Sequence, residues 1–216
     1  MTMPFPWVAA AGVAAGAVHL GAYYGGARGL AGFAKALPIV LLIVWVLGCE
    51  PAVGEGYRRL IAAGLLFSMG GDLLLLSRER FRAGLAAFFA GHVCYALAFT
   101  IGGTGFTPAL GWLVPLAIVA AGMLRLLWPH APRERVPIAC YVVMIAVMAW
   151  TAIGRGVAGT TPQPSGMQAA LGALVFMASD ATLALDRFVR PWRGAHAVVM
   201  VTYYAAQMLI AASVAA

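Results

Sequence analysis

Two aspartates, Asp72 and Asp180, are the only acidic residues that lie well inside long apolar runs of this sequence. Asp72 comes six residues before Arg78, and Asp180 comes seven residues before Arg187. If both runs are helices, the helical rise puts each carboxyl roughly 10 Å below the charged end of its helix. A carboxylate near the centre of a bilayer costs about 2.5–3.5 kcal/mol, so such residues usually face the bundle interior and serve a function. The alternative is a structural role, in which each aspartate holds helices together.

Two carboxyls that approach each other in a medium of low dielectric constant cannot both ionise cheaply. Such a pair leaves one protonated acid beside one ionised base, which is the division of labour that general acid–base catalysis needs. The same pair would also suit a proton relay in a transporter. The spacing of the residues does not decide between the enzyme and the transporter.

Several other polar side chains are placed to line the same site. Ser68 precedes Asp72 by one helical turn, so the two share a helix face. The predicted substrate-binding residues are Lys35, Ser68, His92, Tyr95, Tyr141, Tyr203 and Gln207. Lys35 could counter a carboxylate or bind a phosphate, or it could snorkel to the membrane surface. The tyrosines and Gln207 could equally join helices by hydrogen bonds, and His19 is a weaker candidate.

The composition places these residues in a membrane protein. Hydrophobic residues make up 63% of the 216 residues, charged residues make up 10%, and the mean hydropathy is +0.91. A soluble domain carries about 25% charged residues. The net charge of +7 is spread over short loops, which favours contact with anionic lipid headgroups over nucleic-acid binding. No motif or cluster indicates a metal or cofactor site.

The apolar runs predict an all-α, polytopic bundle of eight membrane spans in one domain, residues 1–216. The second span carries Pro38 and is the shortest. The predicted spans are Trp7–Tyr24, Ala36–Cys49, Tyr57–Leu76, Phe81–Ile101, Leu110–Trp128, Val136–Ile153, Met167–Leu185 and His196–Ala215.

The basic residues predict the orientation of this bundle. Of the 14 Lys and Arg residues, 11 fall in or beside the first, third, fifth and seventh loops. The positive-inside rule then puts these loops in the cytoplasm and both termini outside. The two aspartates lie toward the cytoplasmic side, which in a bacterium is the inner face of the inner membrane.

A faint internal repeat relates the two halves of the chain, residues 1–108 and 109–216. A shift of 108 residues places Asp180 on Asp72 and Tyr203 on Tyr95. Four spans in each half would give parallel repeats, related by an axis along the membrane normal. Such an axis would let the two aspartates converge.

Six segments of the sequence together resemble the lysoplasmalogenase, or YhhN-like, membrane family. They are Lys35–Pro38, Gly64–Leu76, Phe88–Phe99, Tyr141–Trp150, Gly172–Phe188 and Thr202–Ser213. The segments around the two aspartates carry most of the resemblance, which runs in order over most of the chain.

This resemblance implies an eight-span enzyme that hydrolyses the vinyl ether bond of lysoplasmalogens, with membrane lipids as its surroundings and no cofactor. The products would be a fatty aldehyde and a glycerophospho-base. The aspartates of the family's motifs map to Asp72 and Asp180, and the lysine of its motif maps to Lys35. A proton-coupled transporter of lipids or small molecules that uses the same aspartates is the alternative.

Overall fold

The computed structural model describes residues 3–101, 109–157 and 163–215, and these residues form α-helices and short helical turns without any strand. The long helices are α1 (Phe5–Tyr24), α2 (Arg28–Gly48), α3 (Glu55–Leu74), α4 (Phe81–Thr100), α5 (Leu113–Leu127), α6 (Arg135–Val157), α7 (Gln163–Ala184) and α8 (Ala195–Ala212). Three short segments adjoin them: η1 (Arg78–Arg80), η2 (Leu110–Trp112) and the π-helical turn η3 (Leu185–Val189).

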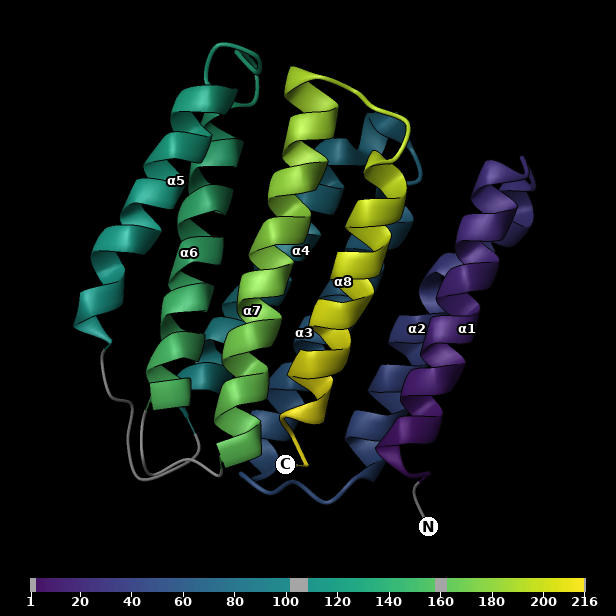
Figure 1. Cartoon of the computed structure of the whole chain (residues 1–216), viewed down its shortest axis with the longest axis vertical. Coiled ribbons are helices and arrows are strands. Elements are labelled where there is room, and N and C mark those ends of the chain that lie inside the picture. The colour runs from purple at the N-terminus through teal and green to yellow at the C-terminus, as the bar shows by residue number, and fades with distance from the viewer. Residues whose placement is uncertain (1–2, 102–108, 158–162, 216) are drawn as a thin grey trace.

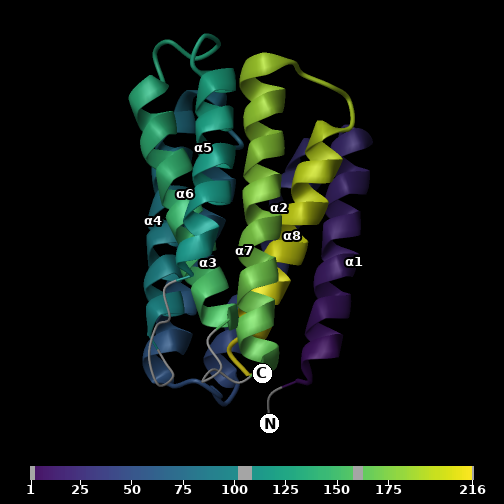
Figure 2. The ribbon, with the colours of Figure 1, turned by 60° about the vertical axis from the view of Figure 1, so that its left-hand side comes forward.

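The eight helices run up and down through one bundle, in which α3 and α4 lie behind α7 and α8 in the view of Figure 1. The start of α1 and the end of α8 lie at the same end of this bundle, as an even number of crossings requires (Figures 1 and 2). Both aspartates lie near the other end, because Asp72 is two residues before the end of α3 and Asp180 is four residues before the end of α7. Which end faces the cytoplasm stays a prediction, as does the internal repeat.

Seven of the described helices are long and apolar enough to cross a membrane. The exception is α3, which carries Glu55, Arg58, Arg59 and Asp72 within 20 residues. Because α2 ends and α4 begins at opposite ends of the bundle, α3 still has to traverse it. Large apolar side chains on the outside of the bundle, such as Val44 and Ile118 at 66% exposure, suit contact with lipid.

The predicted second span was wrong at its start. Residues 28–35, which were assigned to a cytoplasmic loop, already belong to α2, and Pro38 lies inside this helix. Neighbouring helices can satisfy the backbone groups that a proline frees in a membrane. Lys35 therefore lies about two turns inside the helix, roughly 10 Å from Arg28. The other predicted spans end within four residues of the observed helices.

Close contact between α3 and α4 depends on glycine. A Cβ atom built on Gly64 would lie 2.2 Å from the Tyr95 ring, and one on Gly71 would lie 2.5 Å from the Phe88 ring. Small residues at helix interfaces let backbones approach closely in membranes. These two glycines allow the Tyr95 and Phe88 rings of α4 to pack closely against α3.

We expect Gly64→Ala to destabilise the protein by about 1–3 kcal/mol, because the buried Tyr95 ring cannot move aside without strain. Gly70 in the same helix has no atom within 4 Å of the position of a Cβ. Gly70→Ala is therefore the matched control, and we expect it to be neutral or to stabilise by up to about 1 kcal/mol through helix propensity. Denaturant unfolding in detergent micelles measures both, and equal effects of the two changes would contradict this packing.

Candidate functional site

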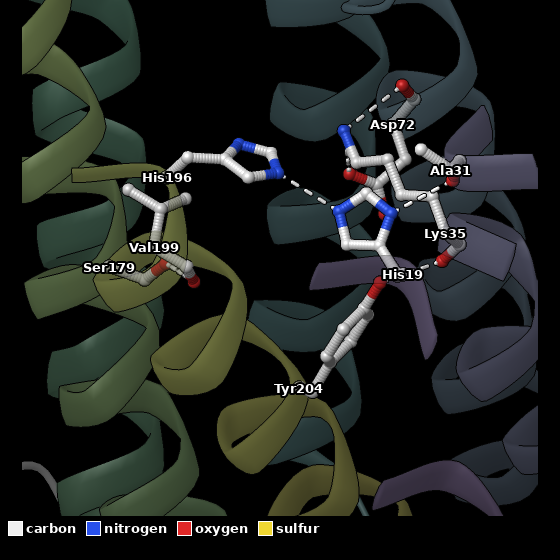
Figure 3. Close-up of polar contacts among 8 residues, drawn as sticks. All are labelled: His19, Ala31, Lys35, Asp72, Ser179, His196, Val199 and Tyr204. Carbon is white, nitrogen blue, oxygen red and sulfur yellow. Dashed lines mark hydrogen bonds and ion pairs between the residues drawn. The ribbon is translucent and has the colours of Figure 1, made fainter. Parts of the chain in front are cut away.

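The first part of the site is a buried ion pair between α2 and α3. The Lys35 Nζ atom lies 2.9 Å from the Asp72 Oδ1 atom, and the two side chains are 9% and 4% exposed (Figure 3). Nζ also donates to the Asp72 backbone carbonyl at 3.3 Å. The Tyr204 hydroxyl donates to the Lys35 carbonyl at 2.9 Å, which ties α8 to the same point. The pair neutralises two charges that neither helix could hold in lipid alone.

Two histidines meet beside this ion pair. His19 of α1 and His196 of α8 approach through their Nε2 atoms at 2.9 Å, and His19 Nδ1 lies 2.8 Å from the Ala31 carbonyl (Figure 3). Since a carbonyl only accepts, His19 Nδ1 carries the proton, and His196 Nε2 donates to His19 Nε2. The Tyr23 ring stacks on His196 with 3.7 Å between ring centroids. These contacts link the first and last helices.

The second part of the site surrounds Asp180 on α7. The Tyr141 hydroxyl of α6 donates to the Asp180 Oδ2 atom at 2.5 Å, and the His92 Nε2 atom of α4 lies 3.7 Å from the same oxygen. Asp180 is 14% exposed at its side chain, whereas His92 is fully buried. Asp180 therefore has a phenol as its closest partner, while Asp72 has an ammonium group.

An aromatic cluster fills the space between the two parts. Phe176, which precedes Asp180 by one turn of α7, is fully buried. Its ring centroid lies 4.7 Å from that of His92, 5.5 Å from that of Tyr203 and 6.5 Å from that of Tyr95. Each carboxyl thus has its own partner, which is Lys35 for Asp72 and Tyr141 for Asp180.

The remaining predicted residues face the interior around this cluster. The Tyr95 hydroxyl donates to the Gln207 Oε1 atom at 2.7 Å. The Tyr203 ring is buried and packs edge to face against Phe88 and Phe176. Within the described part of the chain, several buried polar atoms here have no hydrogen-bond partner: Ser68 Oγ, Asp72 Oδ2, both ring nitrogens of His92, the Tyr203 hydroxyl and Gln207 Nε2. Buried polar groups are normally satisfied, so these atoms are the ones available to a polar ligand or a water.

An apolar cavity of about 310 Å³ adjoins Asp180. Helices α4 to α7, the turn η3 and Leu75, which follows α3, contribute to its walls. Its outer wall is formed by α5, which has only two buried residues of its own, Leu116 and Leu127. Three polar side chains line it: Tyr141, Asp180 and Arg187. Cavities of this size and character suit small apolar ligands. Asp72 and Lys35 do not line this cavity, so the two aspartates differ in their access to it.

The structure thus divides the predicted residues into three contacting sets around one aromatic centre. Lys35 contacts Asp72, Tyr141 and His92 lie at Asp180, and Tyr95 contacts Gln207. Sequence reasoning missed Phe176, Tyr204 and Arg187. The spacing of Phe176 and Asp180 contained a signal, because it repeats that of Ser68 and Asp72. No group of three or more His, Cys, Asp or Glu side chains in the described residues is placed to hold a metal ion.

The segments that carry these residues also match a known protein family. The sequence matches the profile of the YhhN family over residues 30–214. The chain belongs to the YhhN family. The profile covers Lys35, Asp72 and Asp180, whereas His19 of α1 lies ahead of it. No solved structure is significantly similar to this YhhN-family chain.

Relatives of this YhhN-family protein include mammalian and bacterial membrane proteins. The lysoplasmalogenase TMEM86B of Sus scrofa is 38% identical over 184 residues, which cover 83% of this chain and 73% of that protein. The lysoplasmalogenase TMEM86B of Homo sapiens is 37% identical over 187 residues, which cover 85% and 74%. The uncharacterized membrane protein YhhN of Escherichia coli O157:H7 is 28% identical over 179 residues, which cover 82% and 84%.

The buried ion pair gives a direct test by double-mutant cycle. Lys35→Met leaves the Asp72 carboxyl without its partner, and Asp72→Asn leaves the Lys35 ammonium group without its partner. We expect each change to lower the free energy of unfolding by about 3–5 kcal/mol. The double variant should be less destabilised than the sum of the two, because neither charge remains. Denaturant unfolding in detergent measures all four proteins.

The matched control is the exposed pair of Glu55 and Arg59 at the other end of α3, with 3.9 Å between the charged atoms. The same cycle with Glu55→Gln and Arg59→Met should give a coupling energy of no more than about 0.5 kcal/mol. Additive effects of the Lys35 and Asp72 changes would show that the two residues do not interact in the membrane.

Proposed function

We propose that this YhhN-family protein is a membrane hydrolase that cleaves the vinyl ether bond of lysoplasmalogens. The products are a fatty aldehyde and a glycerophospho-base. The observation that carries this proposal is a carboxyl group, Asp180, in the wall of an apolar cavity within a membrane bundle. The names of the mammalian relatives, which are lysoplasmalogenases, support the substrate class.

The chemistry of a vinyl ether requires an acid. Base does not attack the bond, but protonation of the β-carbon gives an oxocarbenium ion. Water then adds to the carbon next to the oxygen, and loses a proton to form a hemiacetal. The hemiacetal collapses to the aldehyde and the free glycerol hydroxyl, so one water is consumed for each bond cleaved. Paired carboxyls serve oxocarbenium chemistry of this kind in glycosidases.

Asp180 is the carboxyl that we assign as the general acid. It lines the cavity, and its closest partner is the neutral hydroxyl of Tyr141. A proton delivered from Asp180 to the β-carbon leaves a carboxylate beside the cationic intermediate, and that carboxylate can then take a proton from the attacking water. Removing a general acid typically lowers a rate by about 10²–10⁴-fold.

Asp72 is the second carboxyl of the proposed pair. Its Oδ1 atom forms an ion pair with the Lys35 ammonium group at 2.9 Å. In this arrangement Asp72 stabilises positive charge in the intermediate from behind the aromatic cluster. The pair is therefore unequal: Asp180 handles the proton, and Asp72 is held in its ion pair with Lys35.

The unpartnered polar atoms around Phe176 serve the water and the glycerol. Tyr203, Gln207 and His92 each have a buried atom without a protein partner among the described residues. We assign these three, with Ser68 and Tyr95, to ordering the attacking water and the glycerol hydroxyl. The hydrocarbon chain of the substrate occupies the apolar cavity beside them. The basic loops at this end of the bundle support access from the cytoplasmic leaflet.

The test is release of fatty aldehyde from a lysoplasmalogen by the purified protein in detergent. We expect Asp180→Asn to lower kcat by at least about 10²-fold, since it cannot donate the proton. Asp72→Asn should also lower kcat, with KM changed less. Asp186→Asn is the matched control, because Asp186 lies in η3 but does not line the cavity, and its Oδ1 atom accepts from the Trp192 amide at 3.0 Å.

Full activity of folded Asp180→Asn protein would overturn the assignment of the acid. Proteoliposomes distinguish the transporter alternative, because uptake of intact lysolipid driven by a pH gradient, without aldehyde, would contradict hydrolysis.

A further inference from the structure

The three polar side chains of the cavity lie at different depths. Arg187 lies at the end of α7, in the π-helical turn η3, where it is exposed. Asp180 lies seven residues earlier, roughly 10 Å deeper along the helix. Leu174, another six residues earlier, lies deeper again in the same cavity wall. The cavity therefore presents a cation at its mouth, an acid in its middle and hydrocarbon at its base.

Aromatic rings hold the Arg187 guanidinium at this mouth. Its Cζ atom lies 3.7 Å from the centroid of the Phe81 ring and 5.9 Å from that of Phe188. Phe81 and Phe188 both line the cavity and pack edge to face. Guanidinium groups stack on aromatic faces, and the stacking fixes the plane of the group. Short π-helical turns such as η3 are rare and frequently lie at functional sites.

We infer that Arg187 binds the phosphate of the substrate headgroup. This inference rests on the proposed function and names a binding residue for it. A lysoplasmalogen presents a phosphate, then one glycerol unit, then the vinyl ether, then the hydrocarbon chain. That order matches the order of Arg187, Asp180 and the apolar base of the cavity. The depth between Arg187 and Asp180 is comparable with the reach from a phosphate to the vinyl ether through an extended glycerol.

The guanidinium suits this role for two further reasons. Its planar fork can bind two phosphate oxygens at once, which orients the lipid as well as holding it. Its position in the wall that also carries Asp180 fixes the distance between headgroup and acid within one continuous helix. Lys35, the residue predicted from the sequence to bind phosphate, is paired with Asp72 and does not line this cavity.

A binding experiment tests the inference without requiring turnover. The ligands are a 1-O-alkyl-glycerophosphocholine, whose saturated ether cannot be hydrolysed by this route, and the matching 1-O-alkylglycerol, which lacks the phosphate. Binding to the purified protein in detergent is measured by calorimetry. We expect Arg187→Gln to weaken binding of the phospholipid by roughly 10-fold or more, as loss of a charge-assisted bond implies, and to leave binding of the alkylglycerol unchanged.

Two further variants control for folding and for general charge. Arg187→Lys keeps the charge but loses the planar fork, so we expect a smaller, several-fold loss that is again confined to the phospholipid. Arg190→Gln removes an exposed charge three residues away that does not line the cavity, and it should bind both ligands like the parent protein. Thermal unfolding confirms that each variant is folded.

Equal weakening of both ligands by the Arg187 changes would overturn the inference, because it would indicate a packing role against Phe81. So would unchanged binding, or a parent protein that binds both ligands equally. Selective loss of phospholipid binding in a protein that releases no aldehyde from a lysoplasmalogen would refute the proposed hydrolysis while supporting the phosphate site.

Discussion

A charge inside a lipid-solvated bundle has no water to stabilise it. The arrangement of this protein depends on the ion pair that compensates one such charge, that of Asp72. Asp72 is paired with Lys35 at 2.9 Å, so the two bury no net charge between α2 and α3. Tyr204 adds α8 to this point through the Lys35 carbonyl. Helices that have little hydrophobic reason to associate in lipid are held in one register by polar contacts of this kind.

The same constraint separates the two aspartates in character. They occupy matching places in the two halves of the sequence, yet one faces an ammonium group and the other faces a phenol and a hydrocarbon-lined space. Phe176 stands in the second half where the first half has Ser68, which makes the interior apolar and aromatic near Asp180. Equivalent residues can thus take unequal roles when their neighbours differ.

Much of the fold and part of the site could be predicted from the sequence. Long apolar runs locate the helices, since a membrane leaves few other ways to satisfy the backbone. The start of α2 was misplaced because the basic residues Arg28 and Lys35 were assigned to the first loop, and this error put Lys35 at the surface. Hydropathy also carries no information on which polar side chains meet, so the separate partners of Asp72 and Asp180 could not be predicted. The cavity lies beside α5, which buries only Leu116 and Leu127 of its own residues. The position of Arg187 in the cavity wall follows from this packing and could not be predicted from the sequence.

The polarity of α3 has a consequence for how this helix is held in the bilayer. This helix carries Arg58, Arg59 and Asp72, and on its own it partitions into lipid less well than its neighbours. Among the residues that the structure describes, the ion-pair partner of Asp72 is Lys35, which comes earlier in the chain. The stability of α3 in the bilayer thus depends on its pairing with α2 as well as on its own hydropathy.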